Sequence, residues 1–110
     1  MVSPESMGSY KIHITPQAKQ DLRDIFDYIY AQSQNESIAN GFINKLVDTL
    51  KETLGYMPNK HTVYQGNIRR FVFTDNKNYC AYFSIDETTE SVAVLAITNT
   101  SQYTRYSKLF

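Results

Sequence analysis

The chain begins with an alternating pattern and then changes to helical spacing. Apolar and polar residues alternate over Tyr10–Thr15, which predicts a half-buried strand whose core side is formed by Tyr10, Ile12 and Ile14. Thr15 followed by Pro16 is typical of the N-cap and first position of a helix. Apolar residues then recur at helical spacing and predict an amphipathic helix ending near Ala31, with a core stripe of Ala18, Leu22, Ile25, Phe26 and Ile29.

A second helix is predicted after a short polar break. Ser33 and Glu36 fit a capping box with Ser33 as the N-cap, and Asn35 is a competing N-cap. Gly41 inside this helix costs about 1 kcal/mol relative to alanine, so we expect it to mark a close helix approach. Gly55 closes the helix. The wide apolar stripe before it consists of Ile38, Phe42, Ile43, Leu46, Val47, Leu50 and Leu54.

The second half of the chain indicates a polar loop followed by three strands. The loop is Pro58–Gly66, and the apolar runs are Asn67–Phe73, Tyr79–Ile85 and Ser91–Ile97. Both faces of the last run are apolar, so we expect this strand to be central and covered on both sides. The polar breaks are short, which indicates an antiparallel meander.

The predicted element order is strand, helix, helix, strand, strand, strand. The short break between the helices favours an antiparallel hairpin. We therefore expect one α+β domain over residues 10–110, in which the helical hairpin packs on a small, twisted, mainly antiparallel sheet. Residues 1–9 are expected to form a disordered leader. The length of 110 residues suits a single core.

Composition narrows the function classes. The 11 basic and 11 acidic residues cancel, so nucleic-acid binding through bulk charge is not indicated, and we expect no direct sequence-specific DNA binding. Cys80 is the only cysteine, which excludes an intrachain disulfide and a cysteine-based zinc site and favours a small core residue. No apolar run is long enough to span a membrane, and no signal-peptide region is evident. We expect a cytoplasmic protein without membrane contact.

A row of carboxylates follows one side of the first helix. Asp21, Asp24 and Asp27 are spaced three residues apart, which more often indicates a solvated face than a metal site. A hard cation requires more converging oxygen ligands than this row offers. We therefore expect no metal and no cofactor.

The most informative feature is the pair Arg69 and Arg70 inside an apolar strand. Neighbouring strand residues point to opposite faces, so one arginine must share the face of the core residues. That placement costs free energy unless the charge is paired or reaches an open groove. One interpretation pairs an arginine with a carboxylate of the first helix and leaves the other solvated. The other interpretation places an arginine in a concave docking face, where its planar fork binds carboxylate or phosphate.

Two further regions carry candidate chemistry. His61 has a side chain suited to acid–base transfer, although a loop histidine is more often simply exposed. His13 is interpreted as structural or solvent-facing. The end of the chain mixes tyrosines with cations, a composition typical of binding hot spots, through Tyr103, Arg105, Tyr106 and Lys108.

The order and spacing of these segments resemble the ParE/RelE superfamily of bacterial type II toxins, from about Ile12 to about Ile97. Three parts carry the resemblance. They are Ile14–Ala18 with Asp21-Leu22 and Ile25–Ile29; Phe42–Leu50 with Leu54 and Pro58; and Ile68–Phe71 with Tyr79, Tyr82, Ile85-Asp86 and Val92–Ile97.

The resemblance implies a small toxin that a cognate antitoxin neutralises. ParE-like members are described as acting on DNA gyrase without cleaving anything, whereas RelE-like members cleave messenger RNA in the ribosomal A site. RelE-like toxins place an arginine where this chain has Tyr79, and basic or histidine residues where it has the uncharged Thr98–Gln102. Uncharged groups stabilise a dianionic transition state poorly.

We therefore expect a ParE-like toxin that binds a macromolecular target rather than an enzyme. The expected contacts to target or antitoxin are Arg69, Arg70, Tyr82, Tyr103, Arg105, Tyr106 and Lys108. The first alternative is a metal-independent, ribosome-dependent ribonuclease that uses Arg69, Arg70, His61 and Tyr79. The second alternative is a degenerate member that keeps only the antitoxin interface.

Overall fold

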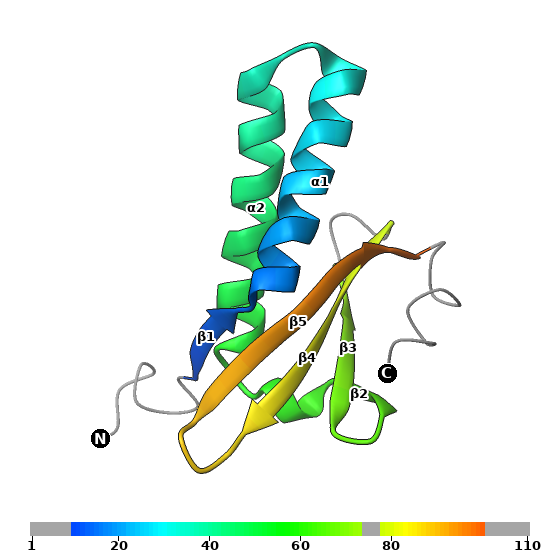
Figure 1. The fold of residues 1–110 in the computed structure, drawn as a ribbon. Coiled ribbons are helices and arrows are strands. Elements are labelled where there is room, and N and C mark those ends of the chain that lie inside the picture. The colour runs from blue at the N-terminus through cyan, green and yellow to red at the C-terminus, as the bar shows by residue number, and fades with distance from the viewer. Residues whose placement is uncertain (1–9, 74–77, 101–110) are drawn as a thin grey trace.

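The computed structural model describes residues 10–73 and 78–100. Two antiparallel helices lie against one face of a five-stranded sheet and project beyond its end (Figure 1). The predicted α+β class and the hairpin are confirmed. In chain order the elements are β1 (Lys11–Ile14), α1 (Pro16–Ser33), α2 (Glu36–Leu54), the short 3₁₀ helix η1 (Pro58–Lys60), β2 (Thr62–Gln65), β3 (Ile68–Val72), β4 (Tyr79–Asp86) and β5 (Ser91–Asn99).

The sheet has the strand order β1-β5-β4-β3-β2. The strands from β2 to β5 form an antiparallel meander, and β1 joins β5 in parallel. The prediction of a central last strand is confirmed, because β5 pairs with β1 on one side and β4 on the other. Val92 and Val94 of β5 face the main core, whereas Ala96 belongs to a second cluster on the other face.

The main core lies between the helices and the sheet. Each buried apolar side chain there gains roughly 1.5–3 kcal/mol relative to exposure. Its members include Ala18, Leu22 and Ile25 of α1, Leu46, Leu50 and Leu54 of α2, and Phe71, Ala81, Phe83, Val92, Val94 and Ile97 of the sheet. The second cluster consists of Cys80, Tyr82 and Ala96 with Tyr64 and Ile68 against them. We call the sheet face of the main core the helix-covered face and the opposite one the outer face.

The predicted start of α1 is confirmed; for α2 the Ser33 cap is wrong, and the competing Asn35 cap is confirmed. Thr15 Oγ1 accepts a hydrogen bond from the backbone N–H of Ala18, as expected for an N-cap. Helix α1 runs on to Ser33, because Gln34 adopts a left-handed conformation with φ 54° and donates its N–H to the carbonyl of Tyr30. Asn35 is then the extended residue before α2, and its side chain caps the helix.

Two other details differ from the sequence-based expectations. Gly41 is exposed, and a Cβ placed there would meet nothing within 4 Å, so it does not mark a close helix approach. The expected Pro58–Gly66 loop contains η1 and β2. Strand β2 has 4 residues, too few to show a clear alternation of apolar and polar positions. It takes its strand conformation from backbone pairing with β3.

Polar side chains of the first helix fix it to the sheet. Thr15 donates from Oγ1 to the Val94 carbonyl at 2.8 Å. Asp21 is 5 % exposed, and its Oδ2 accepts from the backbone N–H of Ile97 at 2.9 Å. Asp21 therefore does not belong to a solvated carboxylate row. A bulge lies in this part of the sheet, where the β4–β5 register shifts between Tyr82 and Phe83.

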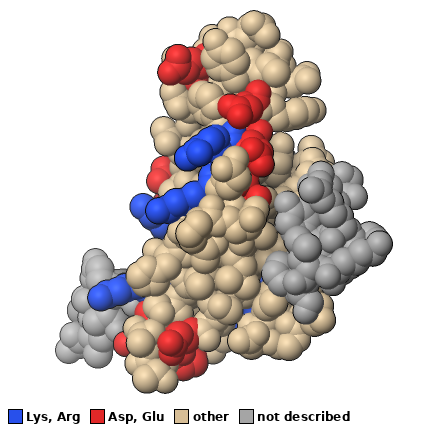
Figure 2. Space-filling model, in the orientation of Figure 1, with Lys and Arg blue, Asp and Glu red and all other residues tan. Residues whose placement is uncertain are grey.

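No helix in the described ranges is long and apolar enough to cross a membrane. Basic and acidic side chains lie close together over the helical hairpin on the face shown in Figure 2.

Candidate functional site

The two arginines of β3 lie on opposite faces of the sheet. Arg69 pairs with Phe83 of the main core, and Arg70 pairs with Tyr82 of the outer cluster. Both side chains are half-buried. The expectation that one arginine shares the core face is confirmed, and that arginine is Arg69.

The side chain of Arg69 links two segments of the chain through a hydrogen bond. Its Nη1 donates to the main-chain carbonyl of His61 at 2.6 Å, which joins the segment between η1 and β2 to the middle of β3. The side chain also lines an open hollow of about 300 Å³ beside the β2–β3 turn, together with Asn59, Val63, Gly66, Asn67, Ile85 and Glu87. A charged donor on a carbonyl strengthens the bond relative to a neutral one. The guanidinium of Arg69 is therefore already engaged on the helix-covered side.

Arg70 belongs to an aromatic group on the outer face. Its guanidinium carbon lies 5.4 Å from the centre of the Tyr64 ring, a cation–π distance. The Tyr64 and Tyr82 rings meet edge to face with centroids 4.8 Å apart. Burial raises the pKa of the Tyr82 phenol, Cys80 adds to the rise, and Arg70 opposes it. Tyr82 is therefore a neutral phenol at physiological pH, at the strand position opposite Arg70.

His61 lies on the helix-covered face with Arg69. Its ring packs edge-on against Phe71 and Phe83, with centroid distances of 5.2 and 5.9 Å. Its Nε2 is buried and has no hydrogen-bond partner in the described part of the chain. Burial lowers the pKa of the imidazole, and Lys60 and Arg69 lower it further. The interpretation of His61 as an exposed loop histidine is wrong, because its ring is half-buried against Phe71 and Phe83, directly before β2 begins.

Tyr79 lies at the start of β4 and faces the helices. It is 8 % exposed and packs edge-on against Phe42 of α2, with centroids 5.6 Å apart. Burial raises the pKa of its hydroxyl, with a contribution from Tyr28. Tyr79 and Phe83 are four residues apart on β4, so Tyr79 lies about 13 Å along the strand from the register position of Arg69.

The structure thus divides the predicted site residues into groups. His61 and Arg69 lie together on the helix-covered face, and Arg70 lies with Tyr82 on the outer face. Tyr79 is at the opposite end of the helix-covered face. Two predicted regions lie outside the described residues: the leader 1–9 and the tail contacts Tyr103, Arg105, Tyr106 and Lys108.

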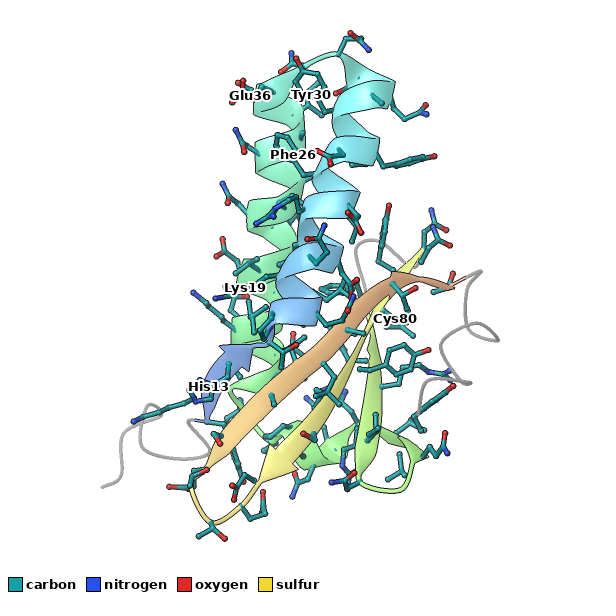
Figure 3. The ribbon with its side chains drawn as sticks, in the orientation of Figure 1. His13, Lys19, Phe26, Tyr30, Glu36 and Cys80 are labelled. Carbon is teal, nitrogen blue, oxygen red and sulfur yellow. The ribbon has the colours of Figure 1, made fainter. Side chains whose placement is uncertain are left out.

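Sequence reasoning missed Tyr64 as a site residue. The sequence pattern predicts a loop at Tyr64, whereas in the structure Tyr64 lies on β2 and its ring contacts the guanidinium of Arg70. No signal in the sequence points to this contact, because it depends on the register between β2 and β3. The expectation that Cys80 is a buried core residue is confirmed. Figure 3 shows it on β4, whereas the exposed His13 lies on β1 at the far edge of the sheet.

Two of the helix carboxylates that were candidates for an ion pair with an arginine accept hydrogen bonds from other groups. Asp21 accepts from Ile97 and from Gln17, and Asp24 accepts from Gln20 at 2.9 Å. Across residues 10–73 and 78–100, no group of three or more His, Cys, Asp or Glu side chains is arranged to hold a metal ion.

Solved structures of bacterial toxins share this fold. The chromosomal ParDE TA system from P. aeruginosa superposes with a TM-score of 0.68 at 17 % identity, covering 84 % of this chain and 97 % of that one. The toxin–antitoxin complex RelBE2 from Mycobacterium tuberculosis gives 0.61 at 14 % identity, with 84 % and 93 % covered. An arginine mutant of the E. coli toxin RelE in the free state gives 0.52 at 14 % identity, with 90 % and 92 % covered. The fold is therefore that of the ParE/RelE toxins.

Residues 12–103 match the family model described as the ParE toxin of the type II toxin–antitoxin system parDE. The chain belongs to this family. No curated protein matches it significantly.

Proposed function

We propose that this protein is a ParE-like toxin that acts by binding a macromolecular target such as DNA gyrase, and that a cognate antitoxin neutralises it. The family membership supports the toxin assignment. The outer face around Arg70 is the proposed contact surface, and the tail residues Tyr103, Arg105, Tyr106 and Lys108 are proposed to extend it. Tyr82 contributes through Arg70, because its own ring is fully buried.

The observation that carries this proposal is the separation of the groups that could transfer protons or hold a phosphorane. RNA cleavage through a 2′-hydroxyl needs a base, an acid and cations converging on one phosphate. Here Arg69 and Arg70 lie on opposite faces of the sheet, and the half-buried His61 ring packs edge-on against Phe71 and Phe83. Tyr79, which stands where RelE-like toxins have an arginine, is buried against Phe42 with a raised pKa.

An antitoxin partner is supported by the same family membership. Similar folds are found in the RelBE2 toxin–antitoxin complex of Mycobacterium tuberculosis and in the ParDE system of P. aeruginosa. The half-buried Arg70 on the outer face is suited to carboxylates of an acidic partner, because arginine binds them with two parallel hydrogen bonds.

The test uses purified toxin in a gyrase supercoiling assay, with primer extension on messenger RNA after induced expression. We expect supercoiling to be inhibited and transcripts to stay intact. Arg70→Ala should weaken inhibition by roughly tenfold or more, the effect of losing about 1.4 kcal/mol of binding. Lys11→Ala, an exposed cation on β1 at the opposite edge of the sheet, is the matched control and should inhibit like the wild type.

Two results would contradict the proposal. Cuts at ribosomal A sites in the primer-extension assay would establish the RelE-like ribonuclease, with Arg69, Arg70, His61 and Tyr79 as the residues to substitute next. A folded protein that binds its antitoxin but neither inhibits gyrase nor cuts transcripts would be the degenerate member.

A further inference from the structure

The edge strand β2 covers only part of β3. Pairing between them runs through Gln65–Ile68 and Val63–Arg69 and ends at Thr62–Arg70, whereas β3 continues to Val72. In that register Lys60 would lie opposite Val72, but Lys60 lies in η1, and its N–H donates to the Met57 carbonyl at 3.1 Å. The end of β3 is therefore an edge that β2 leaves uncovered.

The backbone of Val72 faces this uncovered edge. Phe73 donates its N–H to the Tyr79 carbonyl of β4, and groups of successive residues in a strand point to alternate sides. The N–H and C=O of Val72 therefore point away from β4, past the end of β2. Within the described residues neither group has a strand partner. Unpaired strand-edge groups of this kind are the template for adding another strand.

The surroundings of this edge indicate the chemistry of an occupant. An open hollow of about 390 Å³ lies beside it, lined by Lys60, His61, Thr62, Arg70, Phe71 and Val72. The Val72 side chain lines this hollow and is 38 % exposed. The described lining residues include two cations and no carboxylate. The hollow therefore favours an extended segment with an apolar side chain that packs against Val72 and a negative charge that lies near Lys60 and Arg70.

We propose that the Phe71–Val72 end of β3 is a docking edge for an extended acidic peptide segment of a partner protein, which adds a short strand in line with β2. Main-chain hydrogen bonds to Val72 give the affinity. The two cations that line the hollow, Lys60 and Arg70, favour a negatively charged segment. The proposal concerns the edge and its chemistry and holds whichever target the toxin acts on.

The experiment uses a short capped peptide of alternating valine and glutamate as the probe. Binding is followed by fluorescence anisotropy, and amide hydrogen exchange is followed residue by residue by NMR. We expect saturable binding and a slowing of exchange at the Val72 amide by roughly an order of magnitude at saturation. A peptide with lysine in place of glutamate should bind more weakly, and one N-methylated at alternate residues should not bind, because it cannot form the strand ladder.

Matched proline substitutions isolate the backbone contribution. Val72→Pro removes an N–H that points away from β4, which an edge strand tolerates, and should weaken peptide binding by about tenfold. Val63→Pro is the control, because Val63 is also an exposed edge residue but lies outside this hollow. Lys60→Glu should weaken binding by about threefold without touching the core, which keeps the test decisive if Val72→Pro does not fold.

Several outcomes would overturn the inference. Absence of peptide binding, binding without protection of the Val72 amide, or equal binding by the two proline variants would each do so. Protection that appears without peptide and rises with protein concentration would show that a second copy of the chain occupies the edge instead.

Discussion

The helix-covered face and the outer face of the sheet carry adjacent residues of the same strands, yet they hold their polar groups in different ways. On the helix-covered face, Arg69 donates to a main-chain carbonyl and His61 is packed between aromatic rings. On the outer face, Arg70 lies over the ring of Tyr64 and beside Tyr82. The first arrangement fixes the chain, and the second leaves a cation on an aromatic platform near the surface.

This difference shows how one strand can serve two purposes. The alternation of β3 turns Phe71 and Arg69 to the side where the helices lie, and Arg70 and Val72 to the side where they do not. Side chains on the first side are constrained by the core, so their replacement should mainly change stability. On the second side Val72 is exposed and Arg70 is half-buried, so we expect replacement of these two side chains to change recognition more than stability.

The largest effect is expected in the main core. Phe83→Ala, which truncates a fully buried ring, should lower the free energy of unfolding by about 3–5 kcal/mol. Tyr64→Ala, which truncates a half-buried ring on the edge strand β2, should cost about 1 kcal/mol. Urea unfolding followed by circular dichroism measures both. Equal costs would show that the outer cluster is as important for stability as the main core.

The arginine pair gives an intermediate effect and the sharpest comparison. Arg69→Ala leaves the His61 carbonyl without its charged donor and should cost about 1–2 kcal/mol of unfolding free energy. Arg70→Ala loses a cation–π contact and should cost less than about 1 kcal/mol. The order should reverse in the supercoiling assay, where Arg70→Ala is the more harmful change. If Arg70→Ala is the more destabilising variant, the division of roles between the faces is wrong.

The sequence was sufficient to predict the elements that rest on local patterns. The alternation of β1 and β3, the Thr15-Pro16 start of α1 and the split of the two arginines depend on side-chain periods and on capping chemistry, which neighbouring residues determine. The α+β class then follows from the order of elements.

The features that the sequence did not predict correctly depend on contacts between distant segments. Strand β2 exists because β3 supplies hydrogen-bond partners, and the burial of Asp21 depends on a backbone N–H that lies far along the chain at Ile97. His61 becomes half-buried only because the pairing of β2 with β3 brings its ring against Phe71 and Phe83. Each of these features is created by contacts between distant segments, which a pattern of neighbouring residues does not contain.

The smallest effect is a pH dependence that belongs to the helix-covered face. Burial lowers the pKa of His61 in the folded protein below its ordinary value of 6.5, so between those two values the unfolded chain binds a proton that the folded protein does not. The free energy of unfolding should therefore be insensitive to His61 above about pH 7 and should fall as the pH drops below about 6.5, by at most about 1.4 kcal/mol per pH unit.

His61→Phe tests this assignment, because it keeps a ring against Phe71 and Phe83 and removes the buried Nε2 that has no partner among the described residues. The difference in unfolding free energy between variant and wild type, measured by urea unfolding from about pH 7 to about pH 5.5, should grow in favour of the variant as the pH falls. A difference that stays constant over this interval would mean that His61 takes up its proton equally well in the folded protein. The imidazole would then have access to water, and its exclusion from acid–base chemistry would lose its structural basis.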